Sequence, residues 1–137
     1  MQVEQSMTLY ELIELSQGIG YRIDAQWGFF LTVHMALFGG IIYVDRPLRK
    51  TEKLVAIALY TGFAAVNYLM LSNQVNLLQT IYNEISLISP GEQSSLVNFF
   101  VERAKADWFD KANFYSVVVH IVMLVIVVLT VVYDKKR

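Results

Sequence analysis

The chain has 137 residues, 55% of them apolar, with a mean hydropathy of +0.45 and a net charge of −1. The near-neutral charge gives no electrostatic reason to expect nucleic acid as a partner, and the lack of cysteine excludes disulfides, thiolate metal sites and cysteine nucleophiles. The length fits one domain, and the apolar fraction exceeds the roughly 45–50% that is usual in soluble proteins.

Residues 1–20 are expected to form a short amphipathic helix outside the membrane. Thr8 and Glu11 have the T-x-x-E spacing of a capping box, in which each side chain accepts a hydrogen bond from the other residue's backbone. Gly18 and Gly20 follow where such a helix would end. The segment lacks the basic start of a cleavable signal peptide, so the first span is expected to direct the chain to the membrane.

Three long segments carry no charged residue: 25–44, 54–83 and 112–133. A helix of about 20 residues crosses the roughly 30 Å hydrocarbon core of a bilayer. So short a soluble chain could hardly bury three such segments. We therefore predict an all-α integral membrane protein with three transmembrane helices, at residues 24–44, 54–74 and 113–133.

The second and third transmembrane helices are predicted to extend outside the membrane as a helical hairpin over residues 75–112. Beyond the second span, apolar residues continue at helical spacing: Leu71, Val75, Leu78, Tyr82, Ile85 and Ile88. Pro90 and Gly91 then indicate a turn. A second apolar face follows, made of Leu96, Phe99, Phe100, Ala104 and Trp108. Because no Pro or Gly interrupts the way into the third span, we expect two long helices, roughly 51–88 and 94–133.

Basic residues gather at one side of the predicted membrane. The loop 45–53 contains Arg46, Arg49, Lys50 and Lys53, and the tail 134–137 contains three more of the eleven basic residues. Positive residues tend to stay in the cytoplasm, and a basic loop can also contact anionic lipid headgroups. We expect an inner (cytoplasmic) membrane protein with the N-terminus outside and the C-terminus in the cytoplasm.

Each predicted span contains a polar residue near its middle: His34, Asn67 and His120. Polar side chains in hydrocarbon turn toward protein rather than lipid, so these three are predicted to form a buried polar cluster. A metal site formed by the two histidines is one interpretation, and three others remain open. The cluster could lock the helices by hydrogen bonding, the two histidines could hold haem b as axial ligands, or they could form a proton or ion site.

Small residues mark two helix faces that other helices could approach closely. Ala36, Gly39 and Gly40 lie in the first span, and Gly62, Ala64 and Ala65 lie in the second. Such faces pack helices within one chain or between chains. Both arrangements remain open from the sequence.

No catalytic motif and no metal-ligand set is recognisable. We expect a small non-enzymatic membrane protein, without a cofactor, that acts by assembly. Its partners would be the lipid bilayer and either further copies of itself or other membrane subunits. The alternatives are a haem-carrying anchor of an electron-transfer complex that uses His34 and His120, and a small pore-forming or holin-like oligomer.

Overall fold

The computed structural model describes residues 7–44, 46–88, 94–105 and 107–133. They form four helices: α1 (Leu9–Tyr43), α2 (Lys50–Ile88), α3 (Ser95–Lys105) and α4 (Trp108–Val132). The protein is all-α, and α1, α2 and α4 are each long and apolar enough to span a membrane. The predicted turn at Pro90 and Gly91 and the tail 134–137 lie outside the described residues.

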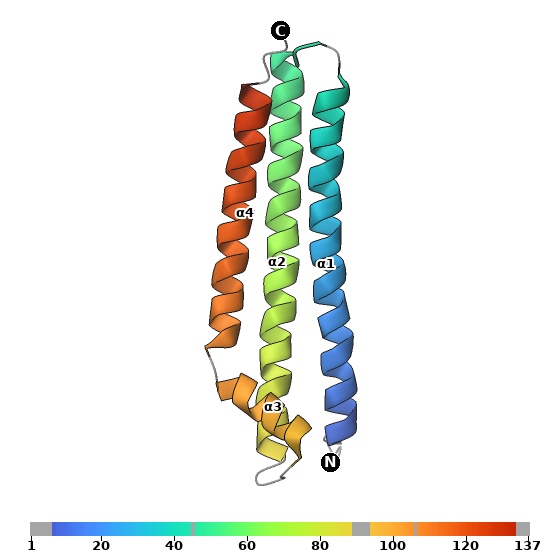
Figure 1. The fold of residues 1–137 in the computed structure, drawn as a ribbon, viewed down its shortest axis with the longest axis vertical. Helices are drawn as coiled ribbons and strands as arrows, with labels where there is room; N and C mark the ends of the chain where they lie inside the picture. The colour runs from blue at the N-terminus through green and yellow to red at the C-terminus, as the bar shows by residue number, and fades with distance from the viewer. Residues whose placement is uncertain (1–6, 45, 89–93, 106, 134–137) are drawn as a thin grey trace, which may run out of the picture.

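The three long helices lie side by side, with α2 between α1 and α4 (Figure 1). At about 1.5 Å per residue, the 39 residues of α2 extend to almost 60 Å, about twice the thickness of a hydrocarbon core. The surplus length of α2 packs against α3, which crosses its end (Figure 1). The predicted extension of α2 beyond the apolar segment is therefore present.

The capping box predicted at the start of α1 is confirmed. The Thr8 backbone N–H donates to the Glu11 carboxylate at 2.7 Å, and the Glu11 N–H donates to Thr8 Oγ1 at 3.3 Å. The Thr8 hydroxyl also donates to the Glu11 carboxylate. The bonds from the Thr8 backbone N–H and from the Thr8 hydroxyl lower the pKa of the Glu11 carboxyl. The first helix therefore begins where the sequence indicates.

The predicted end of that helix at Gly18 and Gly20 is wrong, because α1 runs without interruption from Leu9 to Tyr43. A helical glycine costs only about 1 kcal/mol relative to alanine. Between the two glycines, Ile19 is 1% exposed and packs with Leu12 in an apolar cluster shared with α2. This burial outweighs the glycine cost and keeps the segment helical.

The single helix predicted over residues 94–133 is also wrong, because α3 ends at Lys105 and α4 begins at Trp108. Phe100 of α3 and Phe109 of α4 both pack edge-on against Tyr82 of α2, with ring centroids 4.9 and 5.4 Å from the tyrosine. The break lets both phenylalanines face α2. The buried face of this segment is rotated relative to the predicted apolar face, since Leu96, Phe99 and Trp108 of the predicted face are 40–51% exposed.

Two apolar clusters hold the long helices together. One lies at the α3 end and contains Leu12, Ile19, Val75, Leu78, Ile81, Ile85, Phe100 and Phe109. The other lies toward the loop between α1 and α2 and contains Tyr60, Ala64, Val127 and Val131. The buried polar residues His34, Asn67, Ser116 and His120 lie on the same three helices, so a polar layer interrupts the apolar core.

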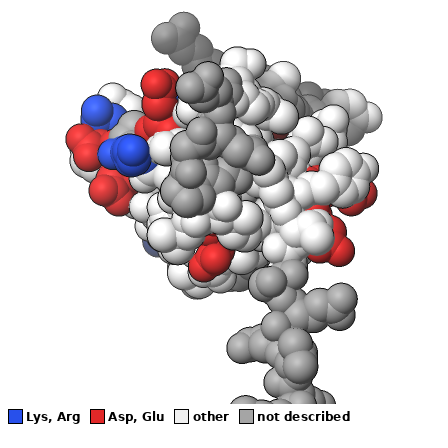
Figure 2. All heavy atoms as spheres, turned by 90° about the horizontal axis from the view of Figure 1, so that it is seen from below, with Lys and Arg blue, Asp and Glu red and all other residues white. Residues whose placement is uncertain are grey.

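Large apolar side chains remain exposed along the outer faces of α1, α2 and α4. Met35, Ile42 and Leu59, for example, are 70–77% exposed. Charged side chains instead gather at the ends: viewed from the α3 end, Asp and Glu surround the rim and Lys and Arg lie on one side (Figure 2). Exposed apolar surface of this extent is typical of contact with lipid, and the chain is compatible with a multi-pass membrane protein.

Candidate functional site

His34 joins α1 to α2. Its Nδ1 lies 2.6 Å from the carbonyl oxygen of Phe30, one turn earlier on α1, and therefore donates to it. Its Nε2 then accepts a hydrogen bond from the Tyr60 hydroxyl of α2. His34 is 2% exposed and Tyr60 is 3% exposed, so this hydrogen bond is closed to solvent and suits a neutral imidazole.

His120 joins α4 to α2 in the same way. Its Nδ1 donates to the carbonyl oxygen of Ser116 at 2.7 Å, and its Nε2 lies 3.0 Å from Oδ1 of Asn67. His120 and Asn67 are both buried. The structure thus brings together two of the three predicted cluster residues, whereas His34 pairs with Tyr60 instead.

Phe30 separates the two histidines. Its ring centroid lies 4.2 Å from that of His34 and 4.4 Å from that of His120, and the Phe30 side chain is 1% exposed. The site is therefore a His–Phe–His cluster at the centre of the bundle, in which the Phe30 ring lies edge-on to His34 and tilted against His120. Axial ligation of one haem by both imidazoles would require Phe30 to leave and both Nε2 hydrogen bonds to break, so the described residues do not fit that group.

The polar cluster predicted from the sequence did not include Phe30, Tyr60 or Ser116, although Tyr60 shares a helix face with Asn67 and Ser116 shares one with His120. Tyr60 precedes Asn67 by two helical turns and so shares its face of α2, which is the signal that could have identified it. Ser116 likewise precedes His120 by four residues on α4. For Phe30 the sequence contains no comparable signal, because aromatic residues surround it in the chain.

The predicted small-residue faces are exposed in the single chain. Ala36, Gly39 and Gly40 face outward from α1, and a Cβ built on either glycine meets nothing within 4 Å. On α2, Gly62 and Ala65 are exposed in the same way, whereas Ala64 is buried against α4. Apart from Ala64, these residues do not mediate close packing inside the chain.

The structure adds two residues to the face on α1. Gly28, Thr32, Ala36 and Gly40 follow one another at intervals of four, and all are exposed. The Thr32 hydroxyl donates to the Gly28 carbonyl at 2.8 Å, so its polar group is satisfied within the helix. We call these four residues the α1 stripe.

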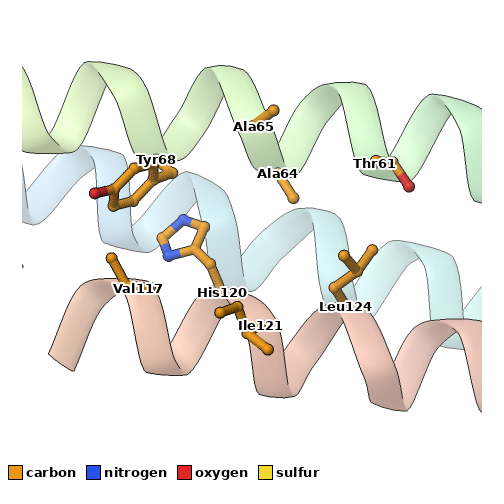
Figure 3. Close-up of a pocket in the computed structure, with 8 residues that line it drawn as sticks. All are labelled: Thr61, Ala64, Ala65, Tyr68, Val117, His120, Ile121 and Leu124. Carbon is orange, nitrogen blue, oxygen red and sulfur yellow. The ribbon is translucent and has the colours of Figure 1, made fainter. Parts of the chain in front are cut away.

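A groove with a volume of about 190 Å³ lies between α2 and α4, beside His120 (Figure 3). In Figure 3 the His120 ring projects from α4 toward α2, next to Tyr68. The other lining residues are Thr61, Ala64, Ala65, Val117, Ile121 and Leu124. The groove is thus apolar apart from His120, Tyr68 and Thr61, and the Thr61 hydroxyl already donates to the Ile57 carbonyl.

The basic loop makes specific contacts. The Arg46 guanidinium donates two hydrogen bonds to the Glu52 carboxylate, at 2.6 and 2.8 Å, and the Arg49 backbone N–H donates a third at 2.8 Å. These bonds lower the pKa of Glu52 from 4.5 to about 2, with Arg46 as the largest cause. The Lys53 ammonium donates to the carbonyl of Val132 at the end of α4. Of the four basic residues predicted to contact lipid headgroups, Arg46 and Lys53 thus also bind within the chain through their side chains.

Comparison with protein-family models, with curated proteins and with solved structures finds no match to this chain. Function is therefore inferred from the fold and from the residues described above. They define an all-α protein with three helices that can span a membrane, a buried His–Phe–His cluster and an outward-facing small-residue stripe.

Proposed function

We propose that this chain is a non-enzymatic multi-pass membrane protein that acts by assembly, with the α1 stripe as its contact surface. The observation that supports the proposal most directly is the outward position of that stripe. In membranes, small residues at intervals of four allow two helix backbones to approach closely, which is a main source of helix association in lipid. Here such a surface is present and no part of the described chain covers it.

The partner that fits best is a second copy of the same chain. Two α1 helices can cross at their stripes, each presenting Gly28, Thr32, Ala36 and Gly40 to the other. The Thr32 hydroxyl stays satisfied in this arrangement because its hydrogen bond is internal to the helix. No unpaired polar group would then enter the interface.

The proposal is tested by energy transfer between two labelled populations of the protein in lipid vesicles. We expect Ala36→Leu combined with Gly40→Leu to reduce transfer to the level of random proximity, because leucine side chains separate the backbones. Val122→Phe adds bulk to an exposed position on α4 and should leave transfer unchanged. No transfer in the wild type would refute self-assembly, and equal transfer in the double variant would refute the α1 stripe as its surface.

We also propose that the membrane is a cytoplasmic membrane and that the loop between α1 and α2 faces the cytoplasm. The support is the basic loop, since arginine and lysine disfavour translocation. The chain has no cysteine, so single cysteines can be labelled without background. Lys50→Cys should react with an impermeant maleimide only after the membrane is opened, whereas Tyr10→Cys should react on intact cells; the reverse pattern would invert the orientation.

A further inference from the structure

Four buried polar atoms between α2 and α4 have no hydrogen-bond partner among the described residues. They are Nδ2 of Asn67 and Oε1 of Gln74 on α2, and Oδ1 of Asn113 and Oγ of Ser116 on α4. A buried polar group without a partner costs about 1–3 kcal/mol, and native structures contain few of them. Four in one helix interface therefore indicate a small hydrogen-bonding ligand.

By their order along the paired helices α2 and α4, the four residues lie in a row that begins at the α3 end. At that end, the Asn113 amide of α4 donates to Asn76 Oδ1 of α2 at 3.0 Å, and Asn76 is exposed. At the inner end, Asn67 of α2 faces His120 of α4 at 3.0 Å. From Asn76 to Asn67 the row covers nine residues of α2, or about 13 Å.

Water is the ligand that fits this row. Each of the four atoms is enclosed by the described chain, so a small molecule suits them better than another chain does. The amide nitrogen donates, the two amide oxygens accept, and the hydroxyl does both. Water can serve donors and acceptors alike, and buried water typically makes about three such bonds.

The inner end of the row is an imidazole that can bind a proton. Because Nδ1 of His120 donates to the Ser116 carbonyl, Nε2 of the neutral ring can only accept. The Asn67 oxygen at Nε2 therefore suits the doubly protonated ring. For the neutral ring, the side-chain amide of Asn67 must flip and exchange its oxygen and nitrogen, so that Nδ2 donates to Nε2.

The groups packed around His120 carry no formal charge when the histidines are neutral. From α1 these are Trp27 and Phe30, and from α2 they are Asn67 and Tyr68. The titratable neighbours are Tyr68 and, across Phe30, His34. Beyond His120, away from α3, the buried residues Ala64, Val127 and Val131 are apolar. The two hydroxyls on this part of α2 are already bonded, that of Tyr60 to His34 and that of Thr61 to the Ile57 carbonyl.

We propose that a file of water molecules enters between α2 and α4 at the α3 end and makes His120 a proton-binding site in exchange with that side of the membrane. When a proton arrives through the file, Nε2 of His120 binds it with its lone pair. The Asn67 amide then presents Oδ1, and the ring gains one positive charge. Phe30 separates this site from His34, whose Nε2 already accepts from Tyr60.

Trp27 provides the readout, because its ring centroid lies 5.7 Å from that of His120, and an imidazolium quenches indole emission more strongly than a neutral imidazole. The chain has one other tryptophan, Trp108, which is replaced in a Trp108→Phe background. In lipid nanodiscs, Trp27 emission should fall as the pH decreases from about 8 to 5. The change should disappear in His120→Gln and persist in His34→Gln. Emission that is independent of pH, or a change that survives His120→Gln, would overturn the proton site.

The file is tested by the rate of this quenching after a rapid drop in pH. Gln74→Leu and Ser116→Ala remove polar atoms of the row, and each should slow protonation by about tenfold or more, since a dry segment then interrupts the path. Thr130→Val is the matched control on α4, because its hydroxyl already donates to the Ile126 carbonyl; its rate should equal that of the parent. Unchanged rates in both row variants would refute the file. Neither result depends on whether the protein self-assembles.

Discussion

Two histidine side chains link neighbouring helices by hydrogen bonds. His34 connects α1 to Tyr60 of α2, and His120 connects α4 to Asn67 of α2. In each case Nδ1 is fixed by a carbonyl one turn earlier on the same helix, which sets the direction of the ring. Because both hydrogen bonds join these helices to α2, they fix how far α1 and α4 can slide along it.

We predict that Tyr60→Phe destabilises the bundle. The change deletes one hydroxyl and leaves Nε2 of His34 buried without a donor. Hydrogen bonds between membrane helices contribute about 0.6 kcal/mol on average and up to about 1.7, so a loss in that range is expected in unfolding by SDS from mild detergent. Tyr21→Phe, at a position 76% exposed, is the control and should match the wild type. If the two variants behaved alike, the His34–Tyr60 bond would not contribute to stability.

A second residue-level prediction concerns Glu52, which lies before the apolar part of α2. Its pKa is lowered from 4.5 to about 2, first by the Arg46 side chain and then by the Arg49 backbone N–H. The loop contacts are therefore complete above pH 4.5 and are lost as the pH falls through about 2. In an NMR titration, Arg46→Gln should raise the pKa of Glu52 toward 4.5 without reaching it, because the Arg49 bond remains. A wild-type carboxyl that titrates near 4.5 would contradict the contact.

At the scale of elements, α1 is a continuous helix despite Gly18 and Gly20. We predict that Gly18→Ala and Gly20→Ala each stabilise the protein by about 0.5–1 kcal/mol, since alanine favours the helix and restricts the unfolded chain. A Cβ at either position meets nothing within 4 Å, so no clash offsets the gain. The thermal midpoint should rise in both variants. A fall would mean that a bend or a partner at these positions requires glycine.

Much of the element order could be predicted from the sequence, because it depends on local patterns. The capping box fixed the start of α1, and the apolar spacing through Leu71, Val75 and Leu78 predicted the long α2. The break between α3 and α4 could not be predicted, since no Pro or Gly marks it and its cause is the shared contact of Phe100 and Phe109 with Tyr82.

The site was predictable only in part for the same reason. The cost of burying polar groups in hydrocarbon predicted that His34, Asn67 and His120 face inward, and all three are buried. Their pairing depends on how the helices are rotated about their axes. That rotation places Phe30 between the two imidazoles and Tyr60 beside His34, and no local pattern encodes it.

For the molecule as a whole, the described helices leave one side of α1 without a neighbour among them. α1 buries Phe30 and His34 toward α2 and α4 and presents the α1 stripe on the opposite side. Both apolar clusters and the His34–Tyr60 hydrogen bond use the inward side of α1. The chain is therefore held together without the stripe, which leaves that surface available for assembly.

The geometry of assembly follows from the spacing of the stripe. Residues repeated every four positions along a straight helix form a row that crosses its equivalent in a right-handed pair at about −40°, whereas a left-handed pair follows a repeat of about 3.5. In a chain that lacks cysteine, we predict that single cysteines at Gly28, Thr32, Ala36 and Gly40 form disulfides between copies in the membrane. Cysteines at Leu31 and Met35, which are 59% and 73% exposed, should cross-link weakly. Strong cross-linking at Leu31 and Met35 instead would place the contact on another side of α1, and a 3.5-residue period would indicate a left-handed pair.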